Sequence, residues 1–223
     1  MIKFWFNKIV YEIIRDILFV TFVPFFRMRG YGVKNVPSKG PVIFLSNHQS
    51  FFDPIFCQLL VRRHMYYVAR DSLFKHKFVG SFLKFVYAIP IRLGAADLGA
   101  MRKIIGKLKE NATVCLFPEG SRTYDGKIAK VQPGFTLLTR KTGASVVPVV
   151  IDGAFECWPR SKKWPSLGKV RVSYGEAITA EEIAEMGDKA FSVLLMNKMR
   201  QMQDELRKVG GKEAYIYSED KES

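Results

Sequence analysis

Two residues with complementary chemistry lie close together in the first quarter of the chain: His48 and, five residues later, Asp53. A carboxylate that accepts a hydrogen bond from one imidazole nitrogen fixes the tautomer of the ring. It leaves the other nitrogen free as a base and stabilises the imidazolium that forms. A general base held in this way contributes about 10²–10⁴-fold to a rate. The pair therefore indicates proton abstraction; the alternative is that Asp53 only caps a helix and His48 is an ordinary turn residue.

A turn, rather than a helix, is needed to bring these two side chains together. Five residues of helix rotate by about 500°, which leaves the two side chains about 140° apart. The apolar run VIFL at 42–45 predicts a buried strand, and the Ser-Asn pair after it carries turn chemistry. Asp53-Pro54 predicts a helix start, with Asp53 as the N-cap and Pro54 at the first helical position. We expect His48 on a strand-to-helix turn that Asp53 closes opposite the ring.

A second block, PEGSRT, directly follows another apolar run. Gly120 lets the backbone approach a ligand closely, and backbone N–H groups, the Ser121 hydroxyl and the Arg122 guanidinium together suit a phosphate. Loops past the carboxyl ends of strands build the ligand sites of α/β folds, so His48 and Arg122 can share one cleft. Arg92, near the end of a further strand, would add a second positive charge. The alternative for this block is a β-turn with a surface arginine.

The amino-acid composition narrows the classes of molecule that the protein can bind. The 223 residues carry a formal net charge of +14, which indicates a polyanionic partner. The chain is also 48% hydrophobic and contains 18 Phe, a combination that favours an anionic membrane surface over nucleic acid. Its three Cys are widely spaced and its three His lack metal-ligand spacing, so we expect no disulfide framework, no metal site and a cytoplasmic-side location.

Residues 1–29 predict an amphipathic helical segment associated with the membrane. Their charged side chains share one helical face, and apolar side chains cover most of the rest; the charged residues are Lys8, Glu12, Arg15 and Asp16. The uncharged run 17–26 contains a proline and falls short of the roughly 20 residues that span a bilayer. We expect a monotopic segment that lies in or dips into one leaflet; the alternative is a helix packed on the protein's own core.

Strands that alternate with helices predict an α/β fold with a mixed, largely parallel sheet flanked by helices. Besides 42–45, strands are expected at 65–69, 88–93, 113–117, 146–151 and 170–174, and helices at 54–63, 72–86, 98–110, 133–142 and 179–208, with a break at Gly187. Pro148 predicts an edge position or a bulge for its strand. The expected domains are the membrane segment 1–29, an α/β domain at 30–209 and a polar, mobile tail at 210–223.

Taken together, the two blocks resemble the glycerolipid acyltransferase family, in particular the 1-acyl-sn-glycerol-3-phosphate acyltransferases. NHQSFFD at 47–53 matches the first family motif and FPEGSRT at 117–123 the third, while Ile91-Arg92 and VPV at 147–149 match the second and fourth more weakly. Order and spacing agree across about 40–155, roughly half of the chain. The chain departs from the family pattern at Ile91, where many relatives carry an acidic residue, and in having Gln-Pro where relatives often carry Lys shortly before Gly134.

The resemblance implies transfer of a fatty acyl group from an acyl-CoA or acyl-carrier-protein thioester to the 2-hydroxyl of lysophosphatidic acid. The product would be phosphatidic acid, an intermediate of phospholipid biosynthesis. No metal or other cofactor is implied, because a thioester is already activated. In the family, the position matching His48 is the base and the one matching Asp53 orients it. The positions associated with holding the phosphorylated acceptor match Glu119, Gly120 and Arg122, together with Arg92.

Other interpretations of the residues stay open. The acceptor could be glycerol 3-phosphate, another lysolipid or an amino-lipid, although the apolar N-terminus favours a lysolipid. A non-enzymatic membrane-binding protein with a purely structural His48–Asp53 pair would also fit the composition. A nucleic-acid binder would fit the charge alone, and no recognition motif supports it.

Overall fold

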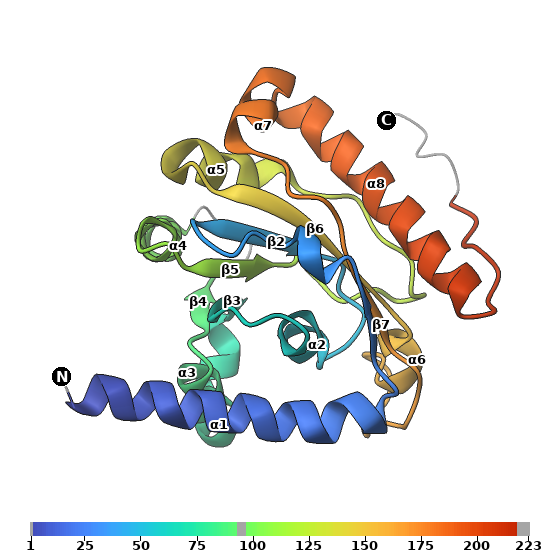
Figure 1. The fold of residues 1–223 in the computed structure, drawn as a ribbon, viewed down its shortest axis with the longest axis horizontal. Coiled ribbons are helices and arrows are strands. Elements are labelled where there is room, and N and C mark those ends of the chain that lie inside the picture. The colour runs from blue at the N-terminus through green and yellow to red at the C-terminus, as the bar shows by residue number, and fades with distance from the viewer. Residues whose placement is uncertain (1, 93–96, 218–223) are drawn as a thin grey trace.

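A central β-sheet with helices on both faces organises the chain (Figure 1). The computed structural model describes residues 2–92 and 97–217, without the side chains of residues 2–9, 78, 82 and 85. The strands are β1 Arg29–Tyr31, β2 Val42–Ser46, β3 Met65–Arg70, β4 Ile89–Ile91, β5 Thr113–Leu116, β6 Ser145–Asp152 and β7 Arg171–Tyr174. Their order is β1-β7-β6-β2-β5-β3-β4; β6 and β7 are antiparallel and the other neighbours are parallel. The predicted α/β class is confirmed.

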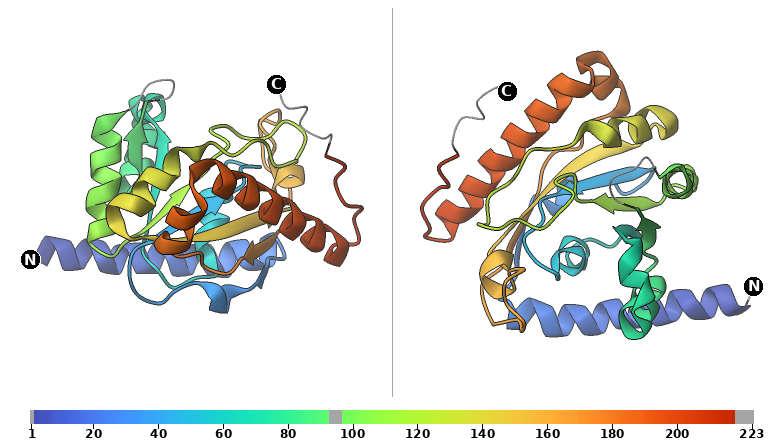
Figure 2. Two further views of the ribbon diagram at one scale, coloured as in Figure 1. Left: turned by 90° about the horizontal axis from the view of Figure 1, so that it is seen from above. Right: turned by 180° about the vertical axis from the view of Figure 1, so that it is seen from behind.

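The helices divide between the two faces of this sheet. They are α1 Ile2–Phe25, α2 Asp53–Leu59, α3 Lys77–Phe85, α4 Leu98–Lys109, α5 Thr136–Thr142, α6 Ala154–Cys157, α7 Ala180–Met186 and α8 Asp188–Val209, with short 3-10 turns η1 Val33–Asn35, η2 Asp71–Lys75 and η3 Pro133–Phe135. α1 and α2 lie on one face, and α4, α5, α7 and α8 lie on the other (Figures 1 and 2). The expected helix at 72–86 is divided into η2 and α3, whereas the break at Gly187 is present, with φ +81°. Of the expected strand 88–93, residue 93 lies outside the described residues, as do residues 218–223 of the tail.

β2 is buried on both faces, which explains its continuous apolar sequence. Successive side chains of a strand point to opposite faces. Val42 and Phe44 therefore pack in the core beneath α1 and α2, while Ile43 and Leu45 pack beneath α8, and all four are fully buried. Because β2 lies between β5 and β6, its carboxyl end faces the loops that follow both neighbours.

Of the two predictions for Pro148, an edge position or a bulge, the edge position is wrong and a bulge-like irregularity is present. Its strand, β6, lies in the interior of the sheet between β2 and β7. The proline lies opposite an interruption in the partner: β7 ends at Tyr174, Gly175 donates to the Pro148 carbonyl, and pairing resumes only at Ile178 with Val146. A missing N–H is tolerated there because the ladder is already broken.

The inner side of α1 joins the core. Tyr11, on this side, is buried and contacts Gln58 of α2 through a hydrogen bond, and Gln58 in turn accepts a hydrogen bond from Tyr67 of β3. Further along, Phe22 and Phe26 pack edge-on against the aromatic rings of α2 and of the turn before it. These contacts fix α1 against α2.

The outer side of α1 exposes apolar side chains. Ile13, Ile17 and Val20, at spacings of four and three residues, are 52%, 54% and 66% exposed and share one helical face. Arg15 lies on the inner side with only 16% of its side chain exposed, and it pairs with Asp16. In residues 2–92 and 97–217, none of the helices combines the length and the apolar character that crossing a membrane requires.

Candidate active site

The turn between β2 and α2 holds His48 and Asp53 in contact. His48 Nδ1 lies 2.7 Å from Asp53 Oδ2, with the carboxylate fully buried and 21% of the imidazole side chain exposed. The same oxygen accepts backbone N–H groups from Gln49 at 2.6 Å and Ser50 at 2.7 Å. The predicted contact is therefore present, but the predicted N-cap is not: Asp53 is the first residue of α2, and its carboxylate points back into the turn. This oxygen accepts hydrogen bonds from N–H groups of the turn, and not from the N–H groups at the start of α2.

This contact determines which imidazole nitrogen carries the proton of the neutral ring. Burial raises the pKa of Asp53, and the hydrogen bonds from His48 and from two backbone N–H groups act in the opposite direction. Because the carboxylate oxygen accepts, Nδ1 carries the proton of the neutral ring. Nε2 is then unprotonated and available as a base.

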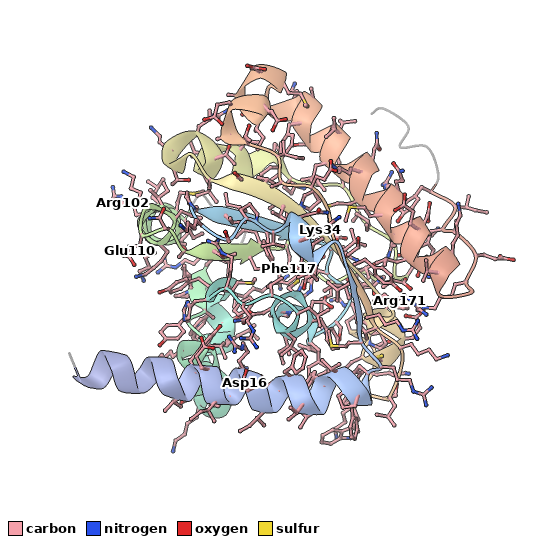
Figure 3. The ribbon with its side chains drawn as sticks, viewed as in Figure 1. Asp16, Lys34, Arg102, Glu110, Phe117 and Arg171 are labelled. Carbon is pink, nitrogen blue, oxygen red and sulfur yellow. The ribbon has the colours of Figure 1, made fainter. Side chains whose placement is uncertain are left out.

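The loop after β5 packs against the other side of the turn at 46–53, which we call the catalytic turn because it carries the candidate base, His48. The His48 N–H donates to Glu119 Oε1 at 2.8 Å, and the His48 carbonyl accepts from the Thr123 N–H at 2.7 Å. The Phe117 ring stacks on the imidazole with a centroid distance of 4.1 Å and an interplanar angle of 20°, at the end of β5 (Figure 3). Residues 117–123, which match the third family motif, thus hold the backbone and the ring of His48 in the first motif.

Glu119 takes a different place from the expected one. Its second carboxylate oxygen accepts the Ala129 N–H at 2.9 Å, so both oxygens bind backbone groups. Burial raises the pKa of this carboxyl to about 7. Glu119 therefore joins the loop to the catalytic turn here, instead of facing a substrate phosphate.

Two amides next to His48 complete the support of the turn, and the sequence analysis missed both. Asn47 continues the sheet with its side chain: its Nδ2 donates to the Ile151 carbonyl at 2.9 Å and its Oδ1 accepts the Ile151 N–H at 2.8 Å. Gln49 donates to the Gly126 carbonyl at 2.9 Å and accepts the Phe155 N–H at 3.2 Å. The sequence did contain a signal for them: an amide side chain stands directly before and directly after the histidine. An amide can donate and accept at once, so each can replace a pair of backbone hydrogen bonds.

Arg122 lies beside the catalytic turn with unused donor capacity. Its guanidinium lies over the Phe51 ring, 3.4 Å from the centroid, and its buried Nη1 has no hydrogen-bond partner among the described residues. Burial lowers the pKa of Arg122, and the positive charges of Arg160 and Arg70 add to this effect against the charge of Asp53. A buried guanidinium N–H directed into an electropositive environment suits an anion.

Gly120 and Ser121 lie in the loop after β5, directly before Arg122, as predicted. Gly120 has φ +73°, a conformation that favours glycine, and the space where a Cβ would project is empty to 4 Å. Ser121 is half-buried. The backbone is therefore open to a ligand at this point of the loop.

Arg92 is not brought to Arg122. Its side chain is 80% exposed and lies 3.9 Å from Asp71. The reason is strand order: β3 lies between β4 and β5, so Arg70, the last residue of β3, takes the position nearer to the loop after β5. Sequence analysis missed Arg70 because strand order is not local information, although its position at a strand end was visible.

The cysteines take no part in this site. Cys57, Cys115 and Cys157 are buried free thiols. Within the described part of the chain, no three His, Cys, Asp or Glu side chains are grouped so as to hold a metal ion.

Comparisons with known proteins agree with the motifs. The chain is 28% identical over 157 residues to a chloroplastic 1-acyl-sn-glycerol-3-phosphate acyltransferase of Arabidopsis thaliana, covering 69% of this chain and 44% of that protein. It is 24% identical to the Bacillus subtilis 1-acyl-sn-glycerol-3-phosphate acyltransferase, covering 79% of this chain and 88% of that one. The chain thus spans about half the length of the plant relatives it matches, at 44% and 51%.

The fold is shared with a solved structure. The crystal structure of PlsC, the 1-acyl-sn-glycerophosphate acyltransferase of Thermotoga maritima, superposes with a TM-score of 0.72 at 23% identity, covering 93% of this chain and 85% of that one. The model of the Acyltransferase family matches residues 27–152, which include the catalytic turn and the loop after β5. Since this match covers more than half of the 223 residues, the chain belongs to the Acyltransferase family.

Proposed function

We propose that this protein transfers a fatty acyl group from an acyl-CoA or acyl-carrier-protein thioester to the 2-hydroxyl of 1-acyl-glycerol 3-phosphate, giving phosphatidic acid. The observation that carries the proposal is the contact between His48 and buried Asp53, next to an arginine with an unpaired buried N–H. The names of the plant and Bacillus relatives support the acceptor.

In the proposed reaction, His48 Nε2 removes the proton from the 2-hydroxyl as its oxygen attacks the thioester carbonyl. The imidazolium that forms is stabilised by Asp53, whose carboxylate already accepts the Nδ1 hydrogen bond. The tetrahedral intermediate then collapses, the C–S bond breaks, and the leaving thiolate takes the proton from His48. The chain needs no nucleophilic side chain for this sequence, because the substrate hydroxyl is the nucleophile.

The acceptor phosphate would bind at Arg122, with Arg70 and Arg160 adding positive charge. Only the short glycerol backbone separates the reacting hydroxyl from the phosphate, so base and guanidinium must lie close together. Arg122 meets this requirement because it stacks on Phe51, a residue of the catalytic turn. Glu119 supports this site by holding the turn and the loop together.

We also propose that the enzyme works as a monotopic protein on an anionic phospholipid membrane, on its cytoplasmic face. The exposed apolar line on α1, formed by Ile13, Ile17 and Val20, supports this placement, since such a surface favours transfer out of water. The net charge of +14 would strengthen binding to anionic lipids.

The test is acyl transfer on lipid vesicles with wild type beside His48→Ala, offering lysophosphatidic acid and glycerol 3-phosphate separately. We expect transfer to lysophosphatidic acid that falls at least about 100-fold in the variant. Transfer to glycerol 3-phosphate alone would keep the mechanism and change the acceptor. Absence of transfer by wild type from either thioester, with vesicle binding intact, would instead favour a non-enzymatic membrane protein.

A further inference from the structure

A second exposed surface lies in the loop between α6 and β7, residues 158–169, which we call the tryptophan loop. Its sequence, WPRSKKWPSLGK, contains four basic residues and no acidic one. Trp164 is 74% exposed and Leu167 is 67% exposed. Large apolar side chains next to lysines, in a loop without an acidic residue, indicate an amphiphilic, negatively charged partner.

The exposure of Trp164 is not a consequence of a loose loop. The loop closes on itself where the Ser166 N–H donates to the Cys157 carbonyl at 2.8 Å. Within it, the Trp158 indole N–H donates to the Lys162 carbonyl at 3.1 Å, and the Lys162 N–H donates to the Pro159 carbonyl at 3.2 Å. A loop held in shape in this way presents its apolar tip with little entropy left to lose on binding.

The tryptophan loop adjoins the end of α1. Directly after the loop, the Val170 N–H donates to the Phe26 carbonyl at 2.9 Å and the Val170 carbonyl accepts the Arg29 N–H at 3.1 Å. Phe25, the last residue of α1, is 64% exposed. The base of the loop therefore lies at this end of α1, and the view from above shows the rest of the loop extending away from the helix (Figures 1 and 2). In the front view the loop and α1 lie along the same lower edge of the molecule, so one flat surface could contact both.

We propose that the tryptophan loop is a second membrane-contact element. Trp164 and Leu167 enter the boundary between headgroups and acyl chains of an anionic bilayer, while Lys162 and Lys163 meet lipid phosphates. Tryptophan suits this boundary because it combines a large apolar ring with an N–H donor. The proposal rests on the proposed function only in taking a membrane as the partner.

This contact also reaches the candidate active site. Trp158 packs against Phe51 and Phe52 of the catalytic turn, with centroid distances of 4.8 and 4.7 Å. Arg160 Nη1 lies 3.5 Å from the Arg122 carbonyl. A bilayer bound at the loop tip thus fixes the height of Arg122 above the lipid phosphates from which the acceptor is drawn.

The test compares two double variants of the whole chain with equal loss of charge. Lys162→Ala/Lys163→Ala removes two lysines from the loop; Lys189→Ala/Lys208→Ala removes two exposed lysines from α8, on the opposite face of the sheet. Partition is measured by flotation with vesicles of phosphatidylcholine containing about one third phosphatidylglycerol. We expect the loop variant to bind about 25-fold more weakly, since each lysine near an anionic surface contributes about fivefold. The α8 variant should change far less.

A second measurement reports the depth of the ring. Because α1, the other proposed membrane contact, also carries a tryptophan, Trp5, this measurement is made on a Trp5→Phe variant. Vesicles with brominated acyl chains should quench its tryptophan fluorescence, and adding Trp164→Phe should remove most of that quenching while binding is kept. Equal partition of the two lysine variants, or quenching unchanged by Trp164→Phe, would overturn the proposal. Normal vesicle binding by the loop variant, with lost transfer from an acyl-carrier-protein thioester alone, would assign the loop to an acidic protein instead. Flotation and fluorescence quenching do not require turnover, so failure of the proposed acyl transfer would be seen separately.

Discussion

Replacing Glu119 with Gln should remove the loss of stability that this carboxyl causes as pH rises, and should lower activity at alkaline pH. The carboxylate is buried and accepts the His48 and Ala129 N–H groups, one on each oxygen. Gln has the same shape but only one acceptor oxygen, so one of the two N–H groups loses its partner. The substitution thus removes a buried charge and one hydrogen bond of the catalytic turn together.

The magnitude for stability follows from the pKa. Burial raises the pKa of Glu119 from 4.5 to about 7. Between these pH values the folded protein binds more protons than the unfolded chain, so this group makes the free energy of unfolding fall as pH rises. A shift of this size corresponds to at most about 3 kcal/mol. Between pH 5 and pH 8, the unfolding free energy of Glu119→Gln should therefore rise relative to that of wild type by up to this amount, because the cost of the lost hydrogen bond is present at both pH values.

Activity should change in the opposite direction. At pH 8 the ionised carboxylate holds both N–H groups, whereas the amide holds one, and the base is less well fixed. Loss of one hydrogen bond to a charged acceptor, about 1.4 kcal/mol, corresponds to about a tenfold lower turnover. The acceptor KM should stay within about twofold, because Glu119 does not face the acceptor.

The assay combines urea unfolding at pH 5 and pH 8 with acyl-transfer kinetics in which lysophosphatidic acid is varied. Comparing the variant with wild type at each pH removes the contributions of all other titrating groups. Parallel unfolding curves at both pH values would refute the buried, ionising carboxylate. A raised acceptor KM with intact turnover would instead place Glu119 on the acceptor phosphate, as the family resemblance implied.

Three further outcomes follow from the same contacts. Asp53→Asn should lower turnover by about 10²-fold or more with vesicle binding kept, because a neutral amide oxygen in the place of Oδ2 stabilises the imidazolium far less than a carboxylate does; acyl transfer and circular dichroism measure this. Arg122→Ala should raise the acceptor KM by about tenfold or more, through loss of a charge-assisted contact, whereas Arg92→Ala should change it by less than about twofold. Ile13→Glu/Ile17→Glu should weaken flotation with anionic vesicles by about tenfold or more, since both side chains would lose apolar burial.

Each of these outcomes has a result that contradicts it. Near-normal turnover in Asp53→Asn would contradict stabilisation of the imidazolium by the Asp53 charge. Equal effects of the two arginine variants would return Arg92 to the acceptor site. Unchanged flotation of the α1 variant would place the membrane contact elsewhere, with Val193→Glu, at an exposed apolar position of α8, as the control for an added charge.

The catalytic turn could be predicted because its information is local. A buried strand, a Ser-Asn turn and a proline at a helix start leave few conformations between 46 and 54, and they bring His48 to Asp53 across a short stretch of chain. The alternation of β2 between two cores could be predicted for the same reason. The family resemblance, which the comparisons confirm, rested on the residues of this turn and of the loop after β5.

The partners of the turn could not be predicted, because they depend on which strands are neighbours. Arg70, and not Arg92, ends the strand next to β5, because β3 separates β4 from β5. Glu119 lies in the right loop, but only the fold shows that its two oxygens meet the N–H groups of His48 and Ala129. The sequence alone does not distinguish a carboxylate that faces a ligand from one that accepts hydrogen bonds from backbone N–H groups.

The position of the candidate active site relative to a membrane follows from one helix. α2 begins with Asp53, whose carboxylate accepts the His48 hydrogen bond, and its next turn carries Phe56, which packs with Phe22 of α1 and with Phe26 just after that helix. The inner side of α1 and the catalytic carboxylate are therefore parts of one rigid contact, while the outer side of α1 faces away from it. A bilayer bound along that outer side, with the tryptophan loop beside it, would meet the base and Arg122 at a fixed height. That geometry suits an acceptor whose acyl chain stays in the membrane while its glycerol and phosphate reach the catalytic turn.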